Sequence, residues 1–178
     1  MVAALKIQNQ EGKLYFEVAG PKDFKYEADS QRLHVEVYQP DIHFFQAMAE
    51  ASIRVPDTLT QSTPVTVEAY SDASVTLAGV RAPSIALSSY THSTVKAHVH
   101  APSCIVSAYT GSWIDVKGSA AHLDLTASSA QIQATGVVAE SGSATAMDKA
   151  VIEAPHEIAH RRELSDGKIV STPSTSKK

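Results

Sequence analysis

Two histidines and a glutamate near the C-terminus have the spacing of a zinc site. His156, Glu157 and His160 form the pattern HExxH, in which two imidazoles one helical turn apart bind zinc and the glutamate acts as a base. A catalytic zinc needs a third protein ligand, and the 18 residues after His160 offer only Glu163 and Asp166. The alternative is a short helix that begins near Pro155 and caps the folded region, or a surface turn. The pattern thus indicates a zinc-dependent hydrolase only as the second interpretation.

A second group of histidines lies in the middle of the chain. His98 and His100 flank Val99, so in a strand both imidazoles point to the same side, and His92 precedes them. Two or three histidines could hold a transition metal. Outward polar positions on either side of an inward valine explain the same residues, and both interpretations stay open.

Other catalytic arrangements find no support in the sequence. Many β-helix enzymes cleave acidic polysaccharides with clustered carboxylates, but Asp115 and Asp124 fall in different columns of the repeat described below. Lys96 and Asp115, one repeat apart, are expected to form an exposed ion pair of at most about 1 kcal/mol. We find no Ser-His-Asp order, no Cys-His pair and no glycine-rich phosphate loop, and the single cysteine, Cys104, is expected to be buried and inert. The sequence therefore predicts no catalytic residue and no cofactor.

Aromatic residues recur at regular intervals. Tyr70, Tyr90 and Tyr109 are separated by 20 and 19 residues, and Trp113 follows shortly after the third. We expect an aromatic ladder along one edge, able to bind a glycan or a partner protein because tyrosine and tryptophan suit half-wet interfaces. The alternative is that the stacked rings only stabilise successive repeats.

The elements that would position these residues follow from an internal repeat of about 19 to 20 residues. Apolar residues align in columns, followed in each copy by a small polar corner and a second apolar set. A fifth, shortened copy is expected from Val138, with its corner at 141–144. The three clearest columns are Val65, Ile85, Cys104 and Leu123; Val67, Leu87, Val106 and Leu125; and Val75, Val95, Ile114 and Ile132.

The spacing inside each copy predicts strands. Apolar and polar residues alternate with period two, and the segments are rich in Val, Ile and Thr. One copy cannot bury its own apolar face, but copies wound into a coil and stacked about 4.8 Å apart close a continuous core. We therefore predict an all-β fold, a parallel β-helix or β-solenoid. An antiparallel sandwich is the alternative, but it gives no reason for whole columns to keep one residue type.

Four regions are expected along the chain. Residues 1–64 form N-terminal strands and a cap continuous with the solenoid, residues 65–154 the coils, residues 155–170 a C-terminal cap, and residues 171–178 a disordered tail. Within the first region, strands are expected at 5–7, 14–18 and 33–38, and a helical or looped stretch at 44–50.

Charge and hydropathy limit the partners. The net charge of −4 gives no electrostatic footprint for nucleic acid, and no stretch approaches the roughly 18 apolar residues that cross a bilayer. If Met1 is the natural start, the sequence indicates a cytoplasmic protein; if a signal peptide was removed, it indicates the cell envelope or secretion. An exposed solenoid end offers unpaired backbone groups, so a homo-oligomer through the solenoid ends or an edge is expected.

The corners of the repeat point to a family. After Ile53-Arg54-Val55-Pro56, corners such as Ser71-Asp72-Ala73-Ser74 and Thr110-Gly111-Ser112 resemble those of the auto-transporter adhesin head domain family, found in many bacteria. The resemblance covers roughly residues 30–154 and implies a parallel β-helix that is not an enzyme and serves as a structural or interaction module, with a glycan or an envelope protein as its partner. The bactofilins, cytoplasmic β-helical scaffolds that polymerise, are a second group that the sequence is similar to. Neither family supplies a catalytic residue for this chain.

Overall fold

The computed structural model describes residues 4–10, 13–19, 37 and 42–172, and the chain divides into two units, Met1–Tyr38 and Gln39–Lys178. In the first unit, β1 (Ala4–Gln10) pairs with β2 (Lys13–Ala19) in an antiparallel two-stranded sheet. The strands expected at 5–7 and 14–18 are thus confirmed. The strand expected at 33–38 and the tail expected from 173 onward lie outside the described residues.

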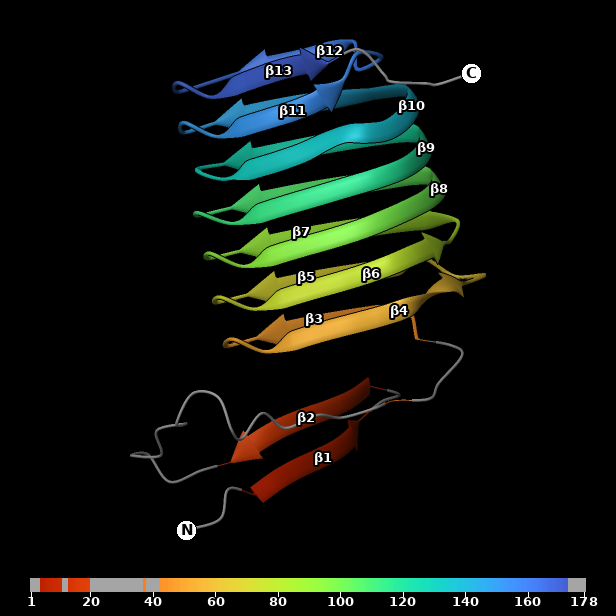
Figure 1. The fold of residues 1–178 in the computed structure, drawn as a ribbon. Helices are drawn as coiled ribbons and strands as arrows, with labels where there is room; N and C mark the ends of the chain where they lie inside the picture. The colour runs from red at the N-terminus through yellow and green to blue at the C-terminus, as the bar shows by residue number, and fades with distance from the viewer. Residues whose placement is uncertain (1–3, 11–12, 20–36, 38–41, 173–178) are drawn as a thin grey trace. The chain divides into compact units, whose positions relative to one another are not determined.

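The second unit is a β-solenoid of about seven coils, as predicted (Figure 1). Its strands pair only in parallel and in order along the stack, because each coil lies on the coil before it. The strands are β3 (Phe44–Met48), β4 (Ser52–Thr60), β5 (Val65–Tyr70), β6 (Ser74–Arg81), β7 (Ser84–Tyr90), β8 (Thr94–Tyr109), β9 (Trp113–Ser128), β10 (Gln131–Met147), β11 (Val151–Pro155), β12 (His160–Glu163) and β13 (Lys168–Thr172).

The predicted columns form the core. Val65 pairs with Ile85, Ile85 with Cys104, and Cys104 with Leu123, so four successive coils place equivalent side chains above one another. All four are at most 1% exposed. Because inward and outward residues alternate along each strand, the same register that stacks the core also stacks the outward side chains.

Each coil turns sharply at one edge, which we call the tight edge; its corners lie at residues 49–51, 71–73, 91–93, 110–112, 129–130, 148–150 and 165–167. Consecutive residues here have positive φ, as at Thr91 (50°) and His92 (60°), which brings the chain back within three residues. Buried serines stabilise the turn. Ser112 Oγ donates to the Ser89 carbonyl of the preceding coil at 2.8 Å and accepts from the Tyr109 amide at 2.9 Å.

The opposite edge, which we call the rounded edge, has no such turn in its later coils. Strands β8, β9 and β10 pass through it without a break, as the curved ribbons in Figure 1 show. Small buried residues, Ala101, Ala120 and Ala139, stack where these strands bend. A small side chain fits there because two backbone layers converge at the bend.

The corner expected at 141–144 is wrong, because these residues lie inside β10. Gly142 continues the column of Cys104 and Leu123, and a Cβ at this glycine would lie 1.9 Å from the Leu123 carbonyl oxygen and 2.8 Å from Ile158 Cδ1. The missing side chain leaves room for Ile158, which is 1% exposed and fills the end of this column. The true corner follows at Asp148 and Lys149.

The stretch expected to be helical or looped at 44–50 is mainly a strand, and the segment after Pro155 is the expected surface turn, not a short helix. Residues 44–48 form β3, which pairs with β5, because alternate residues point into the core. Residues 156–157 form a turn, and His160 begins β12. Arg161 secures this turn, since its guanidinium donates to the carbonyls of Pro155, His156 and Ile158. In the described part of the chain, no helix has the length and hydropathy to cross a membrane.

Candidate functional site

Three tyrosines form a ladder on the outer surface beside the tight edge, as predicted. The centroids of Tyr70 and Tyr90 are 4.7 Å apart with ring planes within 5°, and those of Tyr90 and Tyr109 are 5.2 Å apart with planes within 11°. Strand register imposes this geometry, because Tyr70 pairs with Tyr90 and Tyr90 with Tyr109. We call these three residues the tyrosine ladder.

The stacking determines which ring surfaces can meet a ligand. Both faces of Tyr90 are covered by its neighbours, so only its edge and hydroxyl remain available. At one end of the ladder, the Tyr70 hydroxyl donates to Glu68 Oε2 at 3.2 Å. Burial, together with the Glu68 carboxylate, raises the pKa of Tyr70. At the other end, Tyr109 is followed in its column by Ser128, whose short side chain does not extend the aromatic stack.

Trp113 lies across the corner from Tyr109, in the next column of the coil. The Lys96 ammonium lies 5.1 Å from the centre of its ring, a cation–π contact that comes from the preceding coil. The predicted ion pair between Lys96 and Asp115 is therefore wrong. Asp115 instead pairs with Lys117 two residues along the same strand, at 3.7 Å, because alternate residues of a strand share a face.

A hollow of about 270 Å³ opens at the tight edge beside Trp113. Its position has a clear cause in the chain. Two residues separate Ser128 from Gln131, where three separate Tyr109 from Trp113 and Met147 from Val151, so one corner is a residue shorter than its neighbours. The preceding corner carries Gly111, and the ring of His92 occupies the place where a side chain at Gly111 would lie. The hollow is lined by Gly111, Ser112, Trp113, Ser129, Ala130, Gln131 and Lys149.

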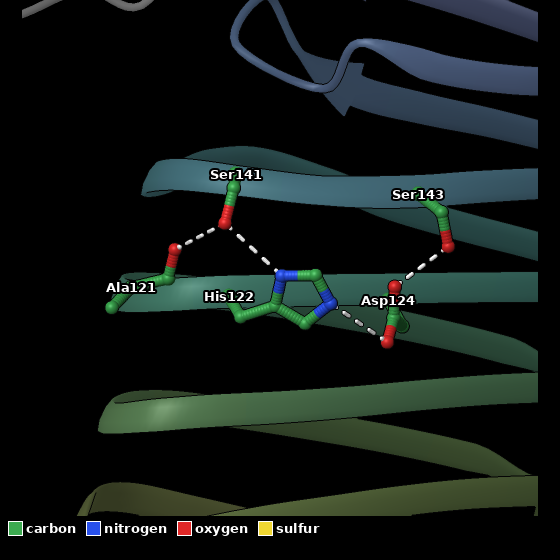
Figure 2. Close-up of polar contacts among 5 residues, drawn as sticks. All are labelled: Ala121, His122, Asp124, Ser141 and Ser143. Carbon is green, nitrogen blue, oxygen red and sulfur yellow. Dashed lines mark hydrogen bonds and ion pairs between the residues drawn. The ribbon is translucent and has the colours of Figure 1, made fainter.

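Figure 2 shows a polar cluster on the same outer surface, beside the rounded edge. His122 Nδ1 lies 3.0 Å from Ser141 Oγ, and its Nε2 lies 3.1 Å from Asp124 Oδ2. Ser143 donates to the other Asp124 oxygen at 2.6 Å, and Ser141 donates to the Ala121 carbonyl at 3.1 Å. We call these four side chains, His122, Asp124, Ser141 and Ser143, the histidine cluster.

The hydrogen-bond directions in this cluster define its chemistry. Since the Ser141 hydroxyl donates to Ala121, it can only accept from Nδ1, and a carboxylate accepts from Nε2. Both contacts are satisfied together by a histidine that carries two protons, which then forms an ion pair with Asp124. A nucleophilic serine would have to donate its proton to the histidine. The arrangement therefore joins two coils and gives no support to nucleophile activation.

Sequence reasoning missed the histidine cluster. Its signal was present, because Ser141 and Ser143 follow His122 and Asp124 by 19 residues, one full coil. Polar outward positions vary in type from coil to coil, so the column was visible only once the register was known.

The other predicted histidine group is divided by the fold. His98 and His100 lie together, with ring centroids 4.9 Å apart, and His100 Nδ1 is 2.9 Å from Ser119 Oγ. Burial, then His98 and Arg81, lower the pKa of His100. His92 lies away from this pair, at a tight corner where its ring occupies the space beside Gly111. Over the described ranges, no group of three or more His, Cys, Asp or Glu side chains is placed to hold a metal ion.

The HExxH residues do not have the geometry that zinc binding requires of this motif. His156 and Glu157 occupy a turn and His160 a strand, so the two imidazoles are not one helical turn apart. All three side chains are exposed. Cys104 is fully buried, and burial raises its pKa to about 12, which keeps the thiol protonated and unreactive.

Comparison with known proteins gives one family. Neither a curated protein nor a solved structure shows a significant match to the chain. The family model described as "Putative auto-transporter adhesin, head GIN domain" matches residues 1–154 of the 178. The match spans the antiparallel strand pair and most coils of the solenoid, including the tyrosine ladder and the histidine cluster. The chain therefore belongs to this family of auto-transporter adhesin head domains.

Proposed function

We propose that this chain is a non-enzymatic interaction module of the adhesin type, and that its binding surface is the tyrosine ladder together with Trp113. The ligand is a glycan or a protein of the cell envelope. The observation that carries the proposal is the ladder itself, because three large amphipathic side chains in register make a continuous strip on a sheet otherwise rich in small polar residues.

The surroundings of the strip support this role. Tyr70, Tyr90 and Tyr109 are each half-buried, which fixes the rings while leaving their edges and hydroxyls available. Rigid aromatic side chains lose little conformational entropy on binding, and tyrosine and tryptophan are enriched among residues that dominate binding energy. The stack thus supplies a preorganised surface, which lowers the entropic cost of binding.

The test compares two exposed residues of strand β8. Purified wild-type protein is screened on a glycan array and against envelope extracts, and the affinity for each hit is measured for Tyr109→Ser and Ile105→Ser. Tyr109 ends the ladder, whereas Ile105 is 49% exposed on the same surface but lies outside the strip. We expect Tyr109→Ser to weaken binding by about 1 kcal/mol or more and Ile105→Ser to leave it unchanged. Wild-type affinity in Tyr109→Ser contradicts the proposal.

We also propose that copies of the chain associate through a solenoid end. Ile53, Val55 and Leu59 of β4 are only partly buried, whereas their partners one coil later, including Val75 and Val80, are fully buried. A further layer over β4 would bury these side chains. Analytical ultracentrifugation over a wide concentration range tests this, and a strict monomer at high concentration contradicts it.

A further inference from the structure

We infer that the hollow beside Trp113 is a subsite for one sugar ring that carries a carboxylate, such as a uronic acid residue at the end of a glycan. The inference rests on the proposed function and gives it a ligand class. In this inference, the ligand makes its main contact with the protein in the hollow beside Trp113, past the end of the tyrosine ladder, and not at the middle of the ladder.

The size of the hollow limits the ligand. Its volume of about 270 Å³ is close to the lower limit of roughly 300 Å³ for small-molecule pockets. A single ring fits such a volume, and a longer chain would have to continue along the surface. The short corner at Ser129 and Ala130 creates this space in the backbone path.

The walls offer both kinds of contact that a sugar ring needs. Lys96 approaches the indole of Trp113 from the preceding coil, whereas the hollow is bounded by Trp113's own coil and the two that follow. The indole therefore presents apolar surface to the hollow, where the C–H groups of a pyranose can pack. The Ser129 hydroxyl, which donates to the Asp148 carbonyl at 3.1 Å, can accept a hydrogen bond from a sugar hydroxyl, and Gln131 supplies an amide group.

The charge of the walls selects an acidic ring. Lys149 is the one charged residue among those that line the hollow, and it is exposed. Asp148 precedes it, but its carboxylate accepts a hydrogen bond from Ser128 at 2.7 Å and is not part of the lining. The ammonium group of Lys149 can therefore attract a carboxylate on a bound ring, whereas Lys96 contacts Trp113 from the preceding coil and is not part of the lining.

The experiment uses the full chain and two probes that differ only in charge, tetragalacturonic acid and its uncharged methyl ester. Binding is measured by isothermal titration calorimetry for the wild type, Trp113→Ala, Lys149→Glu and Lys168→Glu. Lys168→Glu is the matched control, because it makes the same change of charge on β13, in the column of Trp113 but three coils away. Thermal melts check that each variant is folded.

We expect the acid to bind the wild type at least tenfold more tightly than the ester. Lys149→Glu and Trp113→Ala should each weaken binding of the acid at least tenfold, and Lys168→Glu less than twofold. Equal binding of acid and ester, or an equal loss in Lys149→Glu and Lys168→Glu, overturns the inference. If Tyr109→Ser weakens binding to an array ligand while Lys149→Glu does not, the inference fails and the proposed function stands.

Discussion

At both edges of the solenoid, the strand register stacks equivalent residues of successive coils, but the stacked side chains form different structures. At the tight edge, the column that contains Tyr70, Tyr90 and Tyr109 repeats one residue type, and the rings merge into a strip that spans three coils. At the rounded edge, the column Ser84, Ser103, His122 and Ser141 contains a single histidine among serines, and its side chain forms one local hydrogen-bonded cluster. The strand register sets the spacing between side chains of successive coils. The residue types along a column determine whether these side chains form a continuous surface or a single local contact.

The edges also differ in how the backbone turns. At the tight edge the chain turns at residues with positive φ. The corner between Ser128 and Gln131 is one residue shorter than its neighbours. Strands β8 to β10 run through the rounded edge without a turn, and β10 regains the residue missing from its corner at a register shift against β9 between Gln133 and Gly136. The shorter corner at the tight edge is therefore compensated within the following strand, and the hollow lies at that corner.

The largest effect should come from the core that both edges share. Val106 is fully buried and Ile105 beside it is 49% exposed, so Val106→Asn should lower the free energy of unfolding by about 3 to 5 kcal/mol through lost burial and an unsatisfied amide. Ile105→Asn should change it by less than about 0.5 kcal/mol. Urea unfolding measures both, and equal losses in the two variants would refute the assignment of inner and outer faces.

The next effect separates the middle of the tyrosine ladder from its end. Tyr90 stacks on two rings and Tyr109 on one, and each aromatic pair contributes about 0.5 to 1.5 kcal/mol beyond burial. Tyr90→Ser should therefore cost about 1 to 3 kcal/mol in urea unfolding, and Tyr109→Ser about half of that. If Tyr109→Ser proves as costly as Tyr90→Ser, pairwise stacking does not describe the ladder.

The histidine cluster should contribute less than the ladder. His122 and Asp124 are 51% and 36% exposed, and an exposed ion pair contributes about 1 kcal/mol or less. Asp124→Asn should therefore lower the free energy of unfolding by less than about 1 kcal/mol at low salt, and by less still in 1 M NaCl, where the Debye length is about 3 Å. A loss larger than that of Tyr90→Ser would reverse the ranking of the two edges.

The smallest effect concerns pH at the rounded edge. Burial lowers the pKa of His100 in the folded chain, so the unfolded chain takes up this proton first as the pH falls. Stability from this group is therefore complete above the unfolded pKa of about 6.5 and declines as the pH falls below it. His100→Gln should reduce the difference in unfolding free energy between pH 7.5 and pH 5. An unchanged difference would show that His100 does not contribute to it.

The buried core columns of the solenoid could be predicted from the sequence for a physical reason. Burial restricts the inward positions to aliphatic side chains, so Val65, Ile85, Cys104 and Leu123 appear as a column before any coordinates are known. The tyrosine ladder could be predicted from the repeat, because identical residues at the period of the coil must stack. The family follows from the corners between these columns, and the family match confirms it.

The failures share a cause as well. Ser141 to Ala144 have the composition of a corner but lie in a strand, because Gly142 serves to admit Ile158 and not to turn the chain. Lys96 had two attractive neighbours, Asp115 and Trp113, and only the side-chain conformation decides between them. The HExxH spacing indicates a zinc site only on a helix. The repeat does not predict that the chain continues as turn and strand after Pro155. In each case local composition was compatible with two structures, and contacts from another coil selected one.

The one-dimensional stacking of coils has a mechanical consequence. Each coil bonds mainly to the coils directly below and above it, through rows of parallel backbone hydrogen bonds that run along the long axis of the stack. Tension applied between the two ends of the stack loads these rows one coil at a time, as in a zipper, and the released length at each step is the 17 to 22 residues of a single coil. We expect a module of this kind to lengthen in small increments under a pulling force, and the coils that remain folded to keep their part of the tyrosine ladder intact.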